Sequence, residues 1–194
     1  MSKQEILTAS KPPEHNFDVE GIAPALIESP NWVCWVWSWT GKKWTKVPVT
    51  ANGGSASTKD PTTWSDFATV LEAASRNGCG IGYVFNGDIV GIDLDDCRNP
   101  STGYIDGWAQ DIITLAATYT EVSPSGTGVK LFIRGEMPEK FDKQYDRPEG
   151  GSTEVYNTVR FFTVTGQRVQ GTPDDVRERS RPLASILKLF KSWK

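Results

Sequence analysis

The chain has 194 residues, of which 38% are hydrophobic, and its 21 basic and 24 acidic side chains give a formal net charge of -3. This length suits one globular domain or a compact pair of subdomains. The negative balance argues against a protein that coats nucleic acid by bulk charge, although local patches can still bind it. Three distant cysteines and one histidine, without a CxxC pair, exclude a disulfide scaffold and a structural zinc site and indicate a reducing compartment.

No apolar run approaches the roughly 18 residues that a membrane-spanning helix needs, and the first residues lack the apolar core of a signal peptide. We therefore expect a cytoplasmic protein. The charge is unevenly distributed, because residues 168–194 carry seven basic and three acidic side chains and are therefore at +4. Such a basic end suits contact with a polyanion, and a solvated terminal helix explains it equally well.

The first third of the chain divides into a polar start, a hairpin and a helix. Residues 1–20 contain proline and show no periodicity, which predicts a flexible leader. Runs of β-branched and aromatic residues at 32–39 and 43–49 flank a short turn and predict a β-hairpin. An Asp-Pro pair at 60–61 is typical of a helix start, so we expect a helix from there to about Asn77.

The rest of the chain alternates apolar runs with turn and helix patterns. Apolar runs at 80–85 and 89–94 are joined by Asn86-Gly87-Asp88, which predicts a hairpin. Further predicted elements are a helix over 106–117, strands over 118–123, 129–134, 153–156 and 160–165, a charged loop over 136–151 and a closing helix over 182–190. Hairpins that alternate with helices favour an α+β fold with antiparallel or mixed sheets.

One predicted strand ends in two aspartates, Asp93 and Asp95, separated by a single leucine. Residues two apart in a strand point to the same side, with Cβ atoms roughly 6.5 to 7 Å apart, so the carboxylates can share a divalent cation. Oxygen ligands favour Mg²⁺ or Mn²⁺, and two such ions would serve a phosphoryl displacement. A chance pair of surface acids is the alternative, but the apolar strand before them favours a metal site.

The segment from Ser123 to Lys130 places hydroxyl groups and two glycines directly before a strand. Backbone amides around Ser125, Gly126 and Gly128 can cradle phosphate oxygens, and Lys130 can add a positive charge. A plain hairpin connection has the same composition. The phosphate interpretation therefore depends on an anionic ligand nearby.

Glu154 lies in a short predicted strand and is a candidate third metal ligand. Arg160 follows it in a mostly apolar run and is a candidate contact for a triphosphate or a template, with a simple Glu154–Arg160 surface pair as the alternative. Upstream, tryptophans within 32–44 alternate with lysines and could stack single-stranded bases. One face of that hairpin is nevertheless expected to belong to the core.

Three motifs follow one another along the chain: GIDLDDC, SPSGTGVKLFIRG and TEVYNTVRFFTVTG. In this order the chain resembles the archaeo-eukaryotic primase superfamily, in particular the primase-polymerase domains of phage and plasmid replication proteins. The resemblance implies a catalytic core with an RRM-like sheet beside an N-terminal αβ unit. It also implies that Asp93, Asp95 and Glu154 hold two divalent ions, Mg²⁺ or Mn²⁺, and that the middle motif contacts nucleotide phosphates.

The middle motif departs from the family pattern at one position. Where the family has histidine, this chain has Lys130, which neutralises phosphate as a point charge but does not titrate near neutral pH. The nucleotide-binding residues implied by the resemblance are Ser123, Ser125, Gly126, Gly128 and Lys130, with Arg160 as a helper.

The leading hypothesis is template-directed nucleotidyl transfer that makes or extends primers on single-stranded DNA from nucleoside triphosphates. We expect a leader over 1–20, a catalytic domain over 21–170 and a basic helical extension or linker over 171–194. A replicative helicase in cis or in trans is an expected partner, and no GxxxxGK[ST] loop follows residue 166. The alternatives are a non-catalytic module that binds single-stranded or origin DNA and a metal-dependent phosphodiesterase that cleaves nucleic acid.

Overall fold

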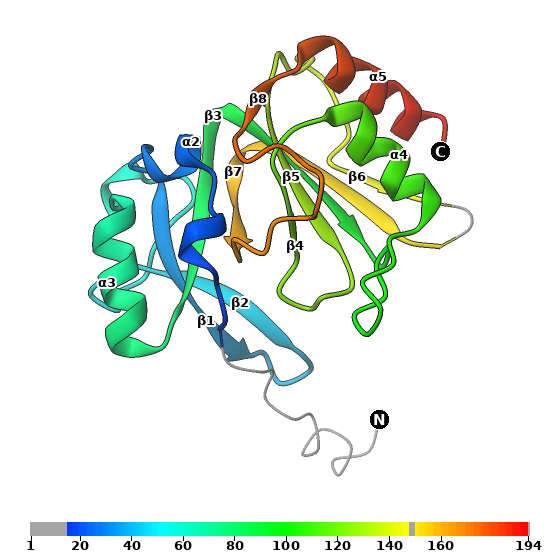
Figure 1. Cartoon of the computed structure of the whole chain (residues 1–194). Coiled ribbons are helices and arrows are strands. Elements are labelled where there is room, and N and C mark those ends of the chain that lie inside the picture. Colours follow the sequence, from blue (N-terminus) through cyan, green and yellow to red (C-terminus); the bar gives the residue numbers. More distant parts are fainter. Residues whose placement is uncertain (1–14, 148–149, 194) are drawn as a thin grey trace.

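The computed structural model describes residues 15–147 and 150–193, and a single eight-stranded sheet runs through it (Figure 1). The strands are β1 (Trp32–Trp39), β2 (Trp44–Val49), β3 (Gly80–Asp95), β4 (Thr120–Val122), β5 (Val129–Arg134), β6 (Gln144–Asp146), β7 (Ser152–Val164) and β8 (Arg177–Glu178). Their order is β2-β1-β3-β5-β4, with β7 along the other edge of β3 and β6 beyond it. Only the β5–β8 pairing is parallel among these strands, so the predicted α+β class is confirmed.

The central strand of the sheet is β3, which pairs directly with β1, β5 and β7. Its first half pairs with β1, its second half pairs with β5 on the same edge, and β7 pairs with it along the opposite edge. The predicted hairpin at Asn86-Gly87-Asp88 is therefore wrong, because residues 80–95 form one strand that bulges there. The strand pair predicted over 153–165 is also a single strand, β7, and its irregularity at Thr158 and Val159 lies opposite the β3 bulge. A turn-forming tripeptide held inside a continuous ladder becomes a bulge.

The two faces of the second half of β3 differ in chemistry. Ile92 and Leu94 join an apolar cluster together with α4 (Gly107–Ala116) and α5 (Ser180–Lys191). Because side chains alternate along a strand, Asp93 and Asp95 lie on the opposite face. The helices predicted over 106–117 and 182–190 are confirmed, and they pack against each other at one end of the sheet (Figure 1).

The first half of the sheet carries α3 (Phe67–Asn77), which packs against β1 (Figure 1). The predicted start of this helix is wrong. Asp60 instead caps a short 3-10 turn, η2 (Pro61–Thr63), and Asp66 caps α3 by accepting the Thr69 backbone N–H at 2.7 Å. Between the two caps, Ser65 forms a β-bridge with Trp32, which keeps the chain extended where a helix was expected.

Segments near both ends of the chain pack on this body. Of the predicted leader, residues 1–14 lie outside the described residues, whereas the Asp18 N–H donates to the Thr165 carbonyl at 2.7 Å. The short helices η1 (Val19–Gly21) and α2 (Pro24–Ile27) follow. At the other end, β8 and α5 lie within 171–194, and α5 buries Leu183, Ile186, Leu187 and Phe190. The division into leader, domain and extension stays a prediction. No described helix has the length and hydrophobicity to cross a membrane.

The packing around β3 leaves no room for a side chain at Gly91. A Cβ there would overlap the Phe85 ring and lie 2.5 Å from Cε2 of Phe162, whereas a Cβ on Gly107 would meet no atom within 4 Å. We expect Gly91→Ala to lower the free energy of unfolding by about 1 to 3 kcal/mol through overpacking. Gly107→Ala, in the first turn of α4, should change it by no more than about 1 kcal/mol, and in the favourable direction. Urea denaturation of both variants measures this, and equal stabilities would contradict the packing described for β3.

Candidate active site

Three of the predicted site residues lie side by side across the sheet. In the strand register Asp93 of β3 is opposite Lys130 of β5 on one edge and opposite Glu154 of β7 on the other. Directly opposed residues in antiparallel strands share a face, so the three side chains form one row. Asp95 stands two residues further along β3 on that face.

Asp93 is the most confined carboxylate of the row. Its exposed fraction is 9%, and its Oδ2 accepts a hydrogen bond from Lys130 Nζ, which is also buried. Its other oxygen, Oδ1, is buried and has no hydrogen-bond partner among the described residues. An ionised carboxylate oxygen without a partner is costly inside a protein, so this atom is a candidate ligand for a cation.

The other two carboxylates stand in contrasting surroundings. Burial, followed by the charge of Asp93, raises the pKa of Asp95 to about 6. Glu154 instead accepts a 2.8 Å ion pair from Arg160, whose guanidinium also lies 4.7 Å from the Tyr156 ring centre. The surface-pair alternative for Glu154 and Arg160 is therefore present in the structure. This ion pair is adjacent to the buried Asp93–Lys130 pair, because Glu154 is directly opposite Asp93.

These carboxylates suit a hard divalent cation by chemistry, because all their donor atoms are oxygens and one of them is unpaired. Cationic side chains nevertheless contact two of the three: Lys130 holds Asp93 and Arg160 holds Glu154. Within residues 15–147 and 150–193 no three His, Cys, Asp or Glu side chains are gathered closely enough to hold a metal ion. For all three carboxylates to share a metal, they would have to move closer together, and Arg160 would have to release Glu154.

A cleft of about 810 Å³ opens over the Asp93–Lys130 part of this row, and Asp95 and Glu154 are not among its lining residues. Asp93 and Lys130 lie in its lining together with Arg160, Lys43 and Lys46. The lining thus holds four cationic side chains and one carboxylate. An excess of positive charge in a concave site favours an anionic ligand such as a phosphate chain.

Lys46 belongs to the predicted lysine-tryptophan hairpin, and the sequence did not distinguish it from the neighbouring lysines as a site residue. Burial, together with the charge of Lys130, lowers its pKa to about 8. Its ammonium lies 5.7 Å from the Trp35 ring centre and 5.4 Å from that of Trp37. Unlike Lys130 and Arg160, Lys46 has no carboxylate partner among the described ion pairs. In the hairpin Lys46 pairs with Trp37, and a correct alignment of the two predicted strands could have indicated this position.

The loop of the middle motif lies beyond the end of β3. Ser123, Ser125 and Thr127 form a chain of hydroxyl contacts at 3.0 and 2.9 Å. The Gly126 N–H donates to the Ser123 carbonyl at 2.9 Å, and the Gly128 N–H donates to the Ser123 hydroxyl at 3.2 Å. These two amides are therefore used within the loop. Ser125 also lines a second cavity, of about 550 Å³, together with Lys46, Trp35 and Trp37.

Glu121 of β4 extends the row on the far side of Lys130, to which it is directly opposed. It is fully buried and accepts hydrogen bonds from the Thr165 N–H, the Gly166 N–H and the Tyr119 hydroxyl at 3.0, 3.0 and 2.9 Å. Burial raises its pKa to about 7 despite these donors. Sequence analysis missed Glu121, because nothing in the short, mostly polar run at 118–123 distinguishes a buried glutamate from a surface one.

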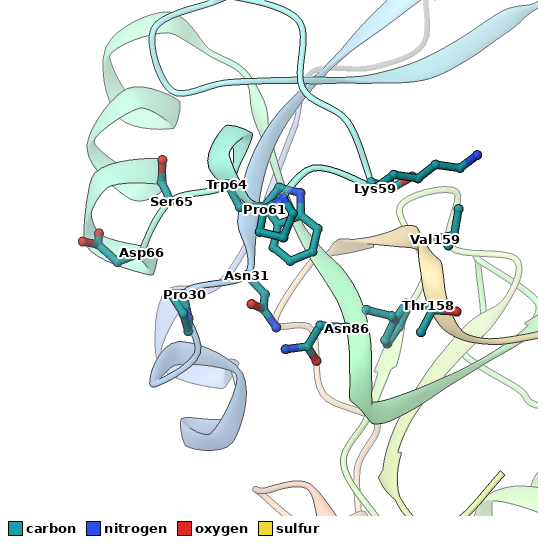
Figure 2. A pocket seen from close by; sticks show the side chains of 12 residues that line it. Pro30, Asn31, Lys59, Pro61, Trp64, Ser65, Asp66, Asn86, Thr158 and Val159 are labelled. Carbon is teal, nitrogen blue, oxygen red and sulfur yellow. The ribbon is translucent and has the colours of Figure 1, made fainter.

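A third cavity, of about 660 Å³, contains none of the predicted site residues (Figure 2). Trp64, Asn31 and Asn86 are among its lining residues, and it lies where η2 faces the bulges of β3 and β7. Thr58 and Val159 line both this cavity and the cleft over Asp93, so the two hollows adjoin.

Comparison with known proteins agrees with the motifs. No protein-family model matches the chain. A curated relative, the DNA primase-polymerase of Nitratiruptor phage NrS-1, is 31% identical over 159 residues, which cover 80% of this chain and 22% of the relative. The chain thus corresponds to about a fifth of the length of that protein. The resemblance read from the motifs is confirmed by this similarity, which supports a domain of the primase-polymerase type.

Proposed function

We propose that this chain catalyses template-directed nucleotidyl transfer, making or extending primers on single-stranded DNA from nucleoside triphosphates. The observation that carries the proposal is the row formed by Lys130, Asp93 and Glu154, whose Asp93 and Lys130 line a cationic cleft. The similarity to a protein named DNA primase-polymerase supports the same reaction class. Because the chain matches 22% of that protein, a helicase partner in cis or in trans remains part of the proposal.

In this proposal Asp93, Asp95 and Glu154 hold two divalent ions, Mg²⁺ or Mn²⁺. When bound, such ions activate the attacking hydroxyl and neutralise the triphosphate. Lys130 would then no longer contact Asp93, and Arg160 would no longer contact Glu154, because these carboxylates would bind the metal ions. Both cations would then face the charge of the nucleotide in the same cleft, where charged hydrogen bonds to phosphate are strong.

Phosphate binding would combine these two cations with Lys46 and the middle motif. Lys46 needs to break no ion pair before it contacts a phosphate, which distinguishes it from Lys130 and Arg160. Ser123, Ser125, Gly126 and Gly128 would contribute hydroxyls and amides after the loop exchanges its internal hydrogen bonds for bonds to the ligand.

A second candidate is a non-catalytic module that binds single-stranded DNA. It is favoured by one observation, the buried Asp93–Lys130 pair, because that pair neutralises the first carboxylate without a metal. Cationic and aromatic contacts with DNA need no divalent ion. Dependence on divalent metal therefore separates the two functions.

The carboxylates can be tested by substitution at Asp95, which has no ion-pair partner among the described residues. We expect Asp95→Asn to lower primer synthesis on single-stranded DNA by about 100-fold or more, and Asp93→Ala/Asp95→Ala to abolish it, because metal-assisted charge stabilisation is lost. Incorporation of labelled nucleotides measures this, and Asp111→Ala, on the exposed surface of α4, is the control. Unchanged synthesis by Asp95→Asn would refute the assigned site.

Removal of divalent ions provides a test without mutation. With EDTA present, we expect synthesis to stop and binding of a labelled single-stranded oligonucleotide to persist, since its phosphate and stacking contacts are metal-independent. Addition of Mg²⁺ or Mn²⁺ in excess of EDTA should restore synthesis. DNA binding with no synthesis under any metal condition would instead identify the binding module, and DNA cleavage would identify the phosphodiesterase.

Lys46 can be tested through nucleotide affinity. We expect Lys46→Met to weaken binding of a nucleoside triphosphate by about tenfold, the effect of losing one charged hydrogen bond, and Lys46→Arg to keep most of the affinity. Lys42→Met is the matched control, because Lys42 lies exposed at the turn of the same hairpin and lines none of the three cavities. Isothermal titration calorimetry measures all three variants, and equal affinities for Lys46→Met and Lys42→Met would exclude the phosphate role.

A further inference from the structure

The cavity drawn in Figure 2 has the chemistry of a nucleobase site, although none of the predicted site residues lines it. Its volume of about 660 Å³ lies within the usual range of small-molecule sites. It offers an aromatic ring together with two side-chain amides, from Trp64, Asn31 and Asn86. A base presents an apolar face and a polar edge, which aromatic rings stack on and amides recognise.

The indole of Trp64 is held in a fixed position. Its Nε1 donates to the Ser57 carbonyl at 2.7 Å, which satisfies the polar edge of the ring and leaves its faces for packing. The ring is only half-buried, so it retains surface to offer a ligand. Figure 2 shows the Trp64 side chain beside Pro61, above the amides of Asn31 and Asn86 in this view.

The two asparagines retain hydrogen-bonding capacity. Asn31 is buried, and the one side-chain hydrogen bond it makes is a long contact of 3.4 Å from Nδ2 to the Tyr83 hydroxyl. Asn86 accepts the Asp88 N–H at 3.3 Å through Oδ1, and its Nδ2 makes no described hydrogen bond. Figure 2 shows the two amide groups turned toward one another, so both can address one polar edge.

The charges of this cavity suit a polynucleotide strand rather than a triphosphate. Lys59 is the exposed cation of the lining and has no ion pair among the described residues. The carboxylate of Asp66 is already used to cap α3, and in Figure 2 it points away from the asparagines. A single cation suits a nucleotide within a strand, which carries one negative charge. A triphosphate carries several negative charges and suits the four cations of the adjoining cleft.

The rim shared with the cleft gives a strand a way between the two sites. Thr58 and Val159 line both hollows. Val159 is 45% exposed and has a φ of 58°, an unusual backbone conformation for a β-branched residue. Strained residues of this kind cluster at functional sites, and this one holds the bulge that brings Thr158 opposite Asn86.

We propose that this cavity binds one unpaired base of the single-stranded template, at a position outside the copied nucleotide, with Trp64 stacking on it and Asn31 and Asn86 contacting its edge. The proposal rests on the proposed function, because it takes the strand from the Asp93 cleft. It assigns template contact to residues outside the three motifs.

An abasic scan tests the proposal. A primer annealed to a longer labelled template fixes the register, and one abasic site is moved along the unpaired template, with affinity measured by fluorescence anisotropy. We expect the wild-type chain to lose affinity about tenfold at one position, the effect of one lost stacking contact. Trp64→Leu should bind the intact template about tenfold more weakly and show no further loss at that position.

Two other variants separate this effect from general damage. Tyr104→Leu alters an aromatic side chain that is 65% exposed and lines none of the three cavities, and it should keep the wild-type scan. Asn86→Ala removes an exposed side chain and should reduce discrimination among the four bases at the sensitive position without changing the melting temperature by more than a few degrees. This variant keeps the test decisive even if Trp64→Leu folds poorly.

The outcomes are distinguishable. Two results would overturn the template-base site. One is a wild-type scan in which affinity is the same at every position, and the other is a sensitive position that persists in Trp64→Leu and keeps its base preference in Asn86→Ala. Primer synthesis on intact template would in either case uphold the proposed function. Failure of the wild-type chain to bind any primer-template would overturn both.

Discussion

The buried contact between Asp93 and Lys130 is the constraint on which the rest of the site depends. Two charges removed from water are stable only when each compensates the other, and separating them would leave an uncompensated charge in the sheet. The pair therefore fixes the register of β5 on β3. A slip of β5 by one residue would turn Lys130 into the apolar cluster under α4 and α5 and leave Asp93 without its partner.

Lys130 is surrounded by groups that favour its positive charge. Glu121 is opposite it on one side and Asp93 on the other, and the face of the Phe162 ring lies 4.6 Å from its ammonium. A lysine in the position where the family has histidine thus carries a structural task in addition to the phosphate contact proposed for it. Its contacts with Asp93 and the Phe162 ring hold the row together in the absence of a ligand. A histidine there would be shorter and neutral for much of the time near pH 7.

Sequence analysis predicted the parts of the fold that local pattern controls. An apolar run identified the strand that carries Asp93 and Asp95, the two-residue spacing put both on one face, and helical periodicity identified most of α3. It failed where a distant strand decides the outcome. The Asn86-Gly87-Asp88 tripeptide has the composition of a turn, but β7 pairs on both sides of it and keeps β3 continuous.

The site shows the same division. The row across the sheet follows from three motifs, whereas the contributions of Lys46 and Trp64 follow from the pairing of β1 with β2 and from the bridge between Ser65 and Trp32. Two aspartates six residues apart, Asp60 and Asp66, each have the composition of a helix cap. Only the bridge that lies between them shows which one begins α3. Long-range pairing is not encoded in any short window of sequence.

The continuity of β3 and β7 has a mechanical consequence. Both strands run through the two apolar clusters of the molecule, so the halves that carry α3 and α4 share the same pair of hydrogen-bonded strands. That ladder, which is interrupted at the bulges between Asn86 and Gly91, opposes a rotation of one half against the other. Exchange of partners in the Asp93–Lys130 and Glu154–Arg160 pairs would change the charge of the site without such a rotation.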